Sequence, residues 1–330
     1  MRTSSGTSAV EGRQNGRVDR GVAIGVVGAT GAVGRVALEL LRERGYTNVR
    51  GFASDRSAGK DVDGLTVEEA TPDALAAGDL DVCLFAIGTA GSLELVPHAV
   101  RGGAIVIDKS SAYRLSDGVP LVVPEVNGDR TLEHDGIVAN PNCSSIPLTC
   151  VLKPLHEAAG IARVRLATYQ ARSGAGAESM ARLRAQDPAE GNLEGDWEFD
   201  GEEFDEETKI RDESRKIMEI PELPISATCV RVPVMVGHAE SIWIETVEAL
   251  SPEQAERLLA EAPSVRLVDF PNPREAAGAD EVLVGRIRPD RAADGNGLTL
   301  FLACDNLRKG AALNAIQIAE IVLAARAVAA

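Results

Sequence analysis

A glycine-rich turn close to the start of the chain limits the folds open to it. Residues 22–27 form a short apolar run, the sequence then reads Gly28-Ala-Thr-Gly31-Ala-Val-Gly34, and apolar residues recur at near-helical spacing afterwards. This order predicts a strand, a glycine turn and a helix, in which backbone amides can approach a pyrophosphate. The spacing is one residue wider than the dinucleotide fingerprint, so a turn packed tightly for structural reasons alone is the alternative.

Further strand-like runs follow the turn. Residues 49–53, 81–87 and 104–107 are apolar segments separated by helix-like or irregular connections. Strands that alternate with crossovers predict an α/β fold with a doubly wound parallel sheet of the Rossmann type. We assign residues 21–142 to this nucleotide-binding domain.

The remainder of the chain predicts a second domain of another kind. A helix-like segment follows residue 143, and strand-like runs follow at residues 164–170, 228–236 and 241–248. Runs of strands with few helices between them predict an α+β domain over residues 143–307. The acidic, Gly-rich stretch 187–207 is interpreted as a solvated excursion. Residues 308–330 have helical periodicity, and we expect this C-terminal helix to pack back onto the first domain.

Composition excludes several classes of partner and location. The net charge of −16 repels nucleic acid and anionic membranes, and aromatic residues for base stacking make up only 3%. Residues 1–20 are polar, lack a signal-peptide core and are expected to be a disordered tail. The Ala-rich C-terminal stretch is interrupted by Gln317, Glu320 and Arg326, so no membrane span is expected. Five widely spaced cysteines without a C-x-x-C pair predict a reducing cytoplasm and no metal site.

One cysteine lies where chemistry is plausible. The segment Asn140-Pro-Asn-Cys143-Ser-Ser-Ile-Pro147 places a thiol where a loop becomes a helix, since proline is tolerated in a first helical turn. Free amides and the helix dipole there would lower the pKa of the thiol and could hold an oxyanion. An inert buried cysteine is the alternative, and we adopt it for the other four, which lie in apolar segments: Cys83, Cys150, Cys229 and Cys304.

The choice of nucleotide is expected at the end of the second strand, where the sequence reads Ser54-Asp55-Arg56-Ser57. Arg56 and Ser57 can receive a 2′-phosphate, which favours NADP(H). Asp55 could instead accept from a ribose hydroxyl, so NAD stays open.

Three blocks resemble the catalytic segments of aspartate-semialdehyde dehydrogenases. They are Pro141-Asn-Cys143-Ser, residues 168–176 (TYQARSGAG) and residues 227–241 (ATCVRVPVMVGHAES), and residues 284–288 and 304–312 match further family segments. The resemblance begins near residue 20 and keeps the order of the family. It implies an NADPH-dependent reductive dephosphorylation of L-aspartyl-4-phosphate to L-aspartate 4-semialdehyde and inorganic phosphate through a Cys143 thioester. This reaction serves the biosynthesis of lysine (through diaminopimelate), methionine, threonine and isoleucine.

The resemblance also implies roles for single residues. Cys143 would be the nucleophile, His238 the general acid/base, and Gln170 would position the acyl intermediate. Arg231 would clamp the substrate α-carboxylate with its paired donors. Positions 231 and 238 would point to opposite faces of one regular strand, so we expect Pro233 or Gly237 to break the alternation.

Substrate and cofactor contacts follow from the same resemblance. Arg114 would bind phosphate with help from Asn142, while Glu206 would meet the substrate ammonium and Lys209 the phosphate. At i,i+3 the last two share a helix face, and an ordinary surface ion pair is the alternative for them. The residues implied at the cofactor, beside Arg56 and Ser57, are Gly28, Thr30, Gly31, Ala32, Val33, Ser173, Gly174 and Asn306.

Two other functions compete with this one. N-acetyl-glutamyl-phosphate reductases share the architecture but carry Gly-Cys-Tyr where this chain has Asn142-Cys143-Ser144. A non-catalytic paralogue that binds nucleotide would usually lose the nucleophile or the base. The family also implies a homodimer, although the segment between Gly176 and Glu206 lacks the Asn-Pro-rich stretch that often contributes to that interface.

Overall fold

The glycine turn folds as a strand, turn and helix, and its strand lies in the interior of the first sheet. In the computed structural model, which describes residues 20–186 and 197–329, β1 (Ile24–Val27) leads through the turn into α1 (Ala32–Glu43). Gly28 has a φ of +91°, and a Cβ on Gly34 would lie 2.1 Å from the carbonyl oxygen of Gly28. Both positions therefore require glycine, the first for its backbone angle and the second for close contact between helix and turn.

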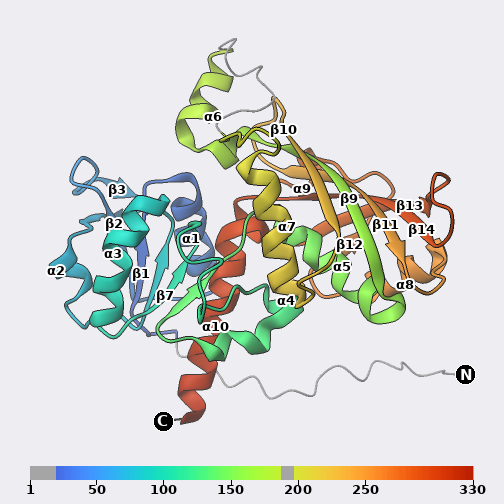
Figure 1. The fold of residues 1–330 in the computed structure, drawn as a ribbon. Helices are drawn as coiled ribbons and strands as arrows, with labels where there is room; N and C mark the ends of the chain where they lie inside the picture. The colour runs from blue at the N-terminus through green and yellow to red at the C-terminus, as the bar shows by residue number, and fades with distance from the viewer. Residues whose placement is uncertain (1–19, 187–196, 330) are drawn as a thin grey trace, which may run out of the picture.

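The first sheet is parallel throughout and covered on both faces (Figure 1). Its strand order is β5 (Glu68–Glu69), β2 (Val49–Ala53), β1, β6 (Val82–Phe85), β7 (Ile105–Asp108) and β8 (Ile137–Ala139). Residues of α1 share a hydrophobic core with one face, and residues of α3 (Thr89–Arg101) and α2 (Pro72–Leu75) share another with the opposite face. The predicted doubly wound sheet is confirmed, and the order reverses between β1 and β6.

The second sheet is mixed, as expected for an α+β domain. Its order is β10 (Ile225–Arg231), β9 (Ile161–Gln170), β11 (His238–Thr246), β14 (Gly297–Cys304), β13 (Val282–Pro289) and β12 (Val265–Leu267). The helices α5 (Ser145–Ala159), α7 (Asp205–Met218) and α8 (Pro252–Glu261) contribute to the core on one face. Shorter elements complete the described chain: β3 (Asp61–Val62), β4 (Leu65–Thr66), α4 (Pro124–Asn127), η1 (Gly128–Glu133), η2 (Arg172–Ala175), α6 (Ala177–Arg184) and α9 (Pro273–Ala276).

The strand expected over residues 228–236 is wrong beyond Arg231. The strand β10 ends there, and residues 232–237 form an irregular connection to β11. Pro233 has no N–H for a ladder, and Gly237 has a φ of +100° that a regular strand does not adopt. The break in alternation that the sequence required between Arg231 and His238 is therefore a change of strand.

The C-terminal helix returns to the first domain, as predicted. A π-helical turn, η4 (Arg308–Ala312), leads into α10 (Leu313–Ala329), whose Ile316 and Leu323 share a core with Ile24 of β1. By length and composition, the helical segment 308–328 could cross a membrane, but 56% of its apolar window is buried inside the protein. A core helix passes the same test, so the prediction of no membrane span is not overturned by this one segment.

Two sequence expectations fall largely outside the described residues. Residues 1–19 of the expected tail and residues 187–196 of the expected acidic excursion are not among them. Arg20, the last residue assigned to the tail, belongs to the fold, because its guanidinium pairs with Glu320 of α10 at 3.0 Å and lies 4.5 Å from the Tyr46 ring centroid.

Candidate active site

A cavity of about 380 Å³ opens between the carboxyl edge of the first sheet and α7. Loops after β6, β7 and β8 reach it from the first domain, as expected at the reversal of strand order. Residues from both domains line it. Those singled out from the sequence are Val33, Arg114, Asn142, Cys143, Ser173, Gly174, Glu206, Lys209, Arg231 and Asn306.

Cys143 and His238 lie against each other although 95 positions separate them. Cys143 sits in the loop between β8 and α5, and His238 is the first residue of β11. The Cys143 Sγ and the His238 Nε2 are 3.2 Å apart. The imidazole is fully buried behind the thiol, which itself lines the cavity. A ligand in the cavity would therefore meet the sulfur first.

The backbone fixes the tautomer of this histidine. The amide N–H of Ala171 donates to the His238 Nδ1 at 3.0 Å, so Nδ1 acts as an acceptor. In a neutral ring the proton then resides on Nε2, the atom that faces Cys143. Burial, together with nearby Arg231, holds the pKa of His238 well below its usual range. His238 is thus a neutral N–H donor toward sulfur.

The expected lowering of the thiol pKa is wrong for this structure. Burial raises the pKa of Cys143 to about 11, and the carboxylate of Glu206 adds to the rise. Arg231, Lys109 and Arg114 act in the opposite direction. Although the cysteine lies just before α5, loss of water around the sulfur outweighs the helix terminus and these cations.

Gln170 and Glu206 join the nucleophile loop to α7. Gln170 donates through Nε2 to the Ser144 Oγ at 2.8 Å and to the Glu206 Oε1 at 3.0 Å. Asn142 donates through Nδ2 to the same Glu206 oxygen at 3.0 Å. Glu206 is only 6% exposed, and Lys209 lies 3.8 Å from it but 2.5 Å from Asp205. Glu206 and Lys209 do not form the ordinary surface ion pair considered as the alternative, because the Glu206 carboxylate is buried in the cavity wall.

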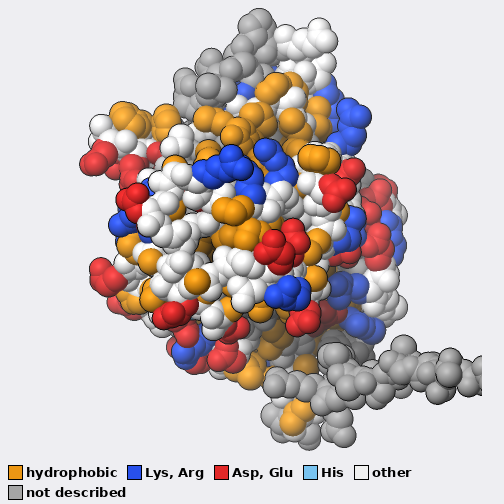
Figure 2. All heavy atoms as spheres, turned by 90° about the vertical axis from the view of Figure 1, so that its right-hand side faces the viewer, with side chains coloured by type: hydrophobic (Ala, Val, Ile, Leu, Met, Phe, Trp, Pro, Cys, Tyr) orange, Lys and Arg blue, Asp and Glu red, His pale blue; other side chains and the backbone are white. Residues whose placement is uncertain are grey.

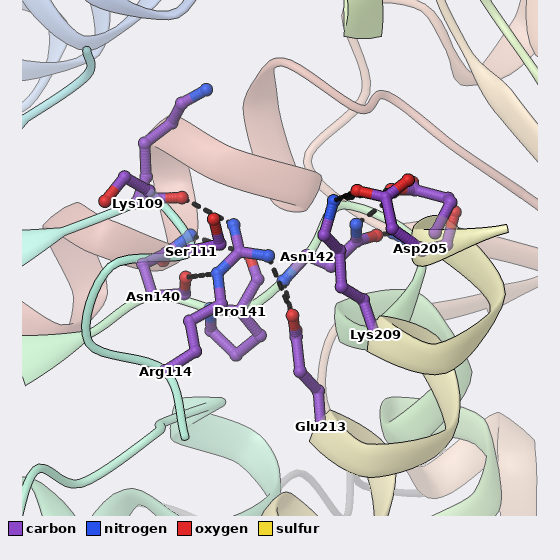
Figure 3. A network of polar contacts seen from close by, with 12 residues as sticks. Lys109, Ser111, Arg114, Asn140, Pro141, Asn142, Asp205, Lys209 and Glu213 are labelled. Carbon is purple, nitrogen blue, oxygen red and sulfur yellow. Dashed lines mark hydrogen bonds and ion pairs between the residues drawn. The ribbon is translucent and has the colours of Figure 1, made fainter. Parts of the chain in front are cut away.

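Arg114 is held by three acceptors (Figure 3). Its Nε donates to the Asn140 carbonyl at 3.1 Å, its Nη2 to the Lys109 carbonyl at 2.5 Å, and its Nη1 to Glu213 at 2.8 Å. The other oxygen of Glu213 accepts from the amide of Asn142 at 2.6 Å. Glu213 was not predicted from the sequence. Its position seven residues after Glu206, on the same face of α7, was the available signal.

Arg231 ends β10 directly beside Gln170 of β9, its register partner in a parallel ladder. Its guanidinium lies 4.5 Å from the centroid of the Trp197 ring and donates to the Ala171 carbonyl at 3.2 Å. A Cβ on Gly174 would lie 2.6 Å from the Arg231 Nη1 and 3.2 Å from the His238 Nε2. Glycine at 174 thus leaves the space in which these two side chains meet.

The residues expected at the cofactor fall into two groups. Gly28, Thr30, Gly31 and Ala32 form the turn and the first residue of α1, while Arg56 and Ser57 lie in the turn after β2, with Arg56 exposed. On the cavity side, Asn306 accepts from the Ser173 hydroxyl at 3.1 Å and from the amide of Gly237 at 2.9 Å.

Several cavity residues were not anticipated. Lys109 follows β7 directly, and burial and Arg114 lower its pKa. The others are Ile87, Gly88, Thr89, Ser110, Ser111, Asn140, Pro141, Trp197, Asp205, Leu307, Gly310 and Ala311. For those that follow β6 and β7, their place at the carboxyl ends of strands beside the reversal of order was a usable signal.

Comparison with known proteins identifies relatives along most of the chain. Residues 23–134 match the NAD binding domain of the semialdehyde dehydrogenases, and residues 152–309 match their dimerisation domain. The aspartate-semialdehyde dehydrogenase of Streptomyces akiyoshiensis is 46% identical, over 91% of this chain and 98% of that protein.

Solved structures agree with the sequence relatives. Aspartate semialdehyde dehydrogenase II from Vibrio cholerae, complexed with ASA, has a TM-score of 0.86 and 37% identity, covering 92% of this chain and 98% of that one. Aspartate semialdehyde dehydrogenase from Candida albicans, solved with NADP, has a TM-score of 0.74 and 28% identity, covering 92% and 99%.

Proposed function

The chain belongs to the aspartate-semialdehyde dehydrogenase family, and from this premise we propose that it reduces L-aspartyl-4-phosphate with NADPH through a Cys143 thioester. Membership makes it an oxidoreductase of aspartate-family amino-acid biosynthesis that uses a pyridine nucleotide. The observation that carries the proposed chemistry is the 3.2 Å contact between the Cys143 Sγ and the His238 Nε2 at the wall of a cation-lined cavity.

The first step is attack of the Cys143 thiolate on the acyl carbon. A carbon–sulfur bond forms, the carbon–oxygen bond to phosphate breaks, and phosphate departs with the electron pair. NADPH, when bound, would supply the hydride that reduces the thioester carbon. The carbon–sulfur bond then breaks, sulfur keeps its electron pair, and L-aspartate 4-semialdehyde leaves.

His238 acts through its Nε2–H in this scheme. That hydrogen faces the sulfur, so it stabilises the thiolate and can donate to oxygen that becomes charged on the adjacent carbon. The overall reaction consumes one proton, which ends on the phosphate. Gln170, anchored to Ser144 and Glu206, positions the acyl group.

Charged side chains around the cavity are suited to bind the oppositely charged groups of the substrate. We assign the α-carboxylate to Arg231, the ammonium to Glu206, and the phosphate to Arg114 and Lys209 with Asn142. Each of these residues lines the same cavity as Cys143. Guanidinium and carboxylate groups suit these partners because their hydrogen bonds are charge-assisted.

The cofactor assignment is NADP(H). The turn from Gly28 to Gly34 joins β1 to the N-terminus of α1, where backbone amides and the helix dipole suit a pyrophosphate. Exposed Arg56, beside Ser57 at the end of β2, suits a 2′-phosphate, and the Candida relative was solved with NADP. In this assignment residues 21–142 bind nucleotide, residues 143–307 carry the substrate chemistry and dimer contacts, and residues 308–330 return to the first domain.

We further propose a cytoplasmic homodimer. The dimerisation-domain match supports self-association, and Tyr169 and Phe301 lie side by side on the face of the second sheet opposite α5, with ring centroids 6.1 Å apart. Figure 2 shows the side of the molecule at the right of Figure 1, where hydrophobic side chains gather near the centre beside Lys and Arg. The five unpaired cysteines support a reducing compartment.

One assay tests the proposed function. NADP⁺ reduction is measured with L-aspartate 4-semialdehyde plus inorganic phosphate, in parallel with N-acetylglutamate semialdehyde and with NAD⁺. We expect phosphate-dependent turnover with the aspartate compound and NADP⁺. The variant C143A should lose turnover and keep NADP binding, while C83A, which removes a buried thiol of the other domain, should keep both. Substantial turnover in C143A would refute the nucleophile, and preference for the N-acetylated aldehyde would favour the reductase alternative.

A further inference from the structure

Four cationic side chains line the cavity, and they differ in how their charge is compensated. Arg114 pairs with Glu213 at 2.8 Å in a nearly buried contact, and Lys209 pairs with Asp205 at 2.5 Å. Arg231 packs over the Trp197 ring. Lys109 is the fourth, and its Nζ has no hydrogen bond or salt bridge to any residue within 20–186 or 197–329.

The structure holds the backbone of Lys109 while leaving its ammonium without a partner in the described chain. Its amide donates to the Phe85 carbonyl at 3.1 Å, and its carbonyl accepts from the Arg114 Nη2. Figure 3 shows the side chain extending away from the Arg114 network. Partial burial of an ammonium that has no acceptor costs desolvation free energy. A bound anion would offset this cost, so the arrangement suits an anion-binding residue.

We propose that Lys109 binds the phosphoryl group of the substrate and holds the inorganic phosphate that leaves. This inference rests on the proposed function. A phosphoryl group carries up to two negative charges, while buried Glu213 offsets the charge of Arg114 and Asp205 offsets that of Lys209. The ammonium of Lys109 forms no salt bridge with a described residue, so its positive charge is offset less than those of Arg114 and Lys209, although the adjacent Asp108 carboxylate acts on it. This charge stabilises the phosphate oxygen that takes the electron pair when the carbon–oxygen bond breaks.

The position of Lys109 favours substrate phosphate over cofactor phosphate. The glycine turn follows β1, whereas Lys109 follows β7, and β6 lies between these two strands. The nearby Ser110, Ser111 and Asn142 line the same cavity wall as Lys109 and Cys143. The positive charge of Lys109 opposes the rise in the pKa of Cys143, which agrees with its location on the substrate side.

The test varies inorganic phosphate in the oxidative direction for the wild type, K109Q and K109R. We expect the KM for phosphate to rise at least tenfold in K109Q and to recover largely in K109R. The KM values for aldehyde and NADP⁺ should stay within about twofold. The matched control is K153Q, since Lys153 is a helix lysine paired with Glu157 away from the cavity.

A second readout does not depend on turnover. Inorganic phosphate should protect Cys143 of the wild type from iodoacetamide, and K109Q should need at least tenfold more phosphate for the same protection. Unchanged phosphate KM and protection in folded K109Q would overturn the proposal, as would a rise confined to the KM for NADP⁺. If the wild type showed no turnover, the proposed function would fail, while the protection measurement would still decide the role of Lys109.

Discussion

Replacing Glu240 by Gln should change how the stability of the protein depends on pH. Glu240 lies two residues after His238 on β11, is 0% exposed, and has no hydrogen-bond partner for either carboxylate oxygen among the described residues. Burial therefore raises the pKa of Glu240 well above its usual range. The folded protein keeps this proton at pH values where the unfolded chain has lost it.

The sign and size of the effect follow from proton linkage. Stability from the protonated acid is fully present below the pKa of the unfolded chain, about 4.3, and is lost as pH rises toward the folded-state pKa. Within that window the free energy of unfolding falls by about 1.4 kcal/mol per pH unit. Glutamine carries no such proton. Between pH 6 and pH 8, E240Q should therefore gain up to about 2.7 kcal/mol relative to the wild type.

The assay is urea unfolding of both proteins at pH 6, 7 and 8 at one protomer concentration, because self-association shifts apparent stability. The matched control is E245Q on the same strand. Glu245 is only partly buried, and hydrogen bonding to Arg165 lowers its pKa, so that variant should show no gain with rising pH. If the difference between E240Q and wild type were the same at all three pH values, Glu240 would be ionised in the folded protein and the reasoning would fail.

Three further outcomes are expected. Iodoacetamide should alkylate Cys143 about tenfold faster per pH unit between pH 7 and 9, because the thiol pKa is raised to about 11; a plateau near pH 7, followed by mass spectrometry, would contradict this. G174A should lower kcat/KM roughly 100-fold, since its Cβ would displace Arg231, whereas G295A, which has open space around it, should be neutral; equal activities would disprove the packing argument. E213Q should cost about 3 kcal/mol in urea unfolding, because Arg114 loses its buried partner; a wild-type free energy of unfolding would show that the pair is dispensable.

The parallel sheet could be predicted because the sequence patterns that indicate it lie within short segments of the chain. A glycine turn between an apolar run and a helical pattern restricts the backbone within a dozen residues, and the later strands repeat the alternation. The end of β10 was missed although Pro233 and Gly237 were visible, because the apolar run continues past Arg231. Only the ladder of backbone hydrogen bonds, a tertiary property, locates where pairing stops.

The site could be predicted only in part from the residues themselves. Loop position singled out Cys143, but nothing in the spacing brings His238 to it, because that contact depends on which strands neighbour each other in the second sheet. The resemblance to a family supplied that pairing. The expected pKa shift of the thiol had the wrong sign because the helix terminus is a local effect, whereas burial comes from the whole fold.

The helix α7 is the element whose role in the site was hardest to predict from the sequence. Its sequence looks like a solvated charged helix, yet Glu206 and Glu213, two turns apart, both turn toward the nucleophile loop. Glu206 holds the side chains of Asn142 and Gln170, and Glu213 holds Arg114 and the Asn142 backbone. Each carboxylate that orients a donor also cancels positive charge in the cavity. A site built in this way needs a cation outside the network to attract an anion, and the described structure leaves Lys109 in that position.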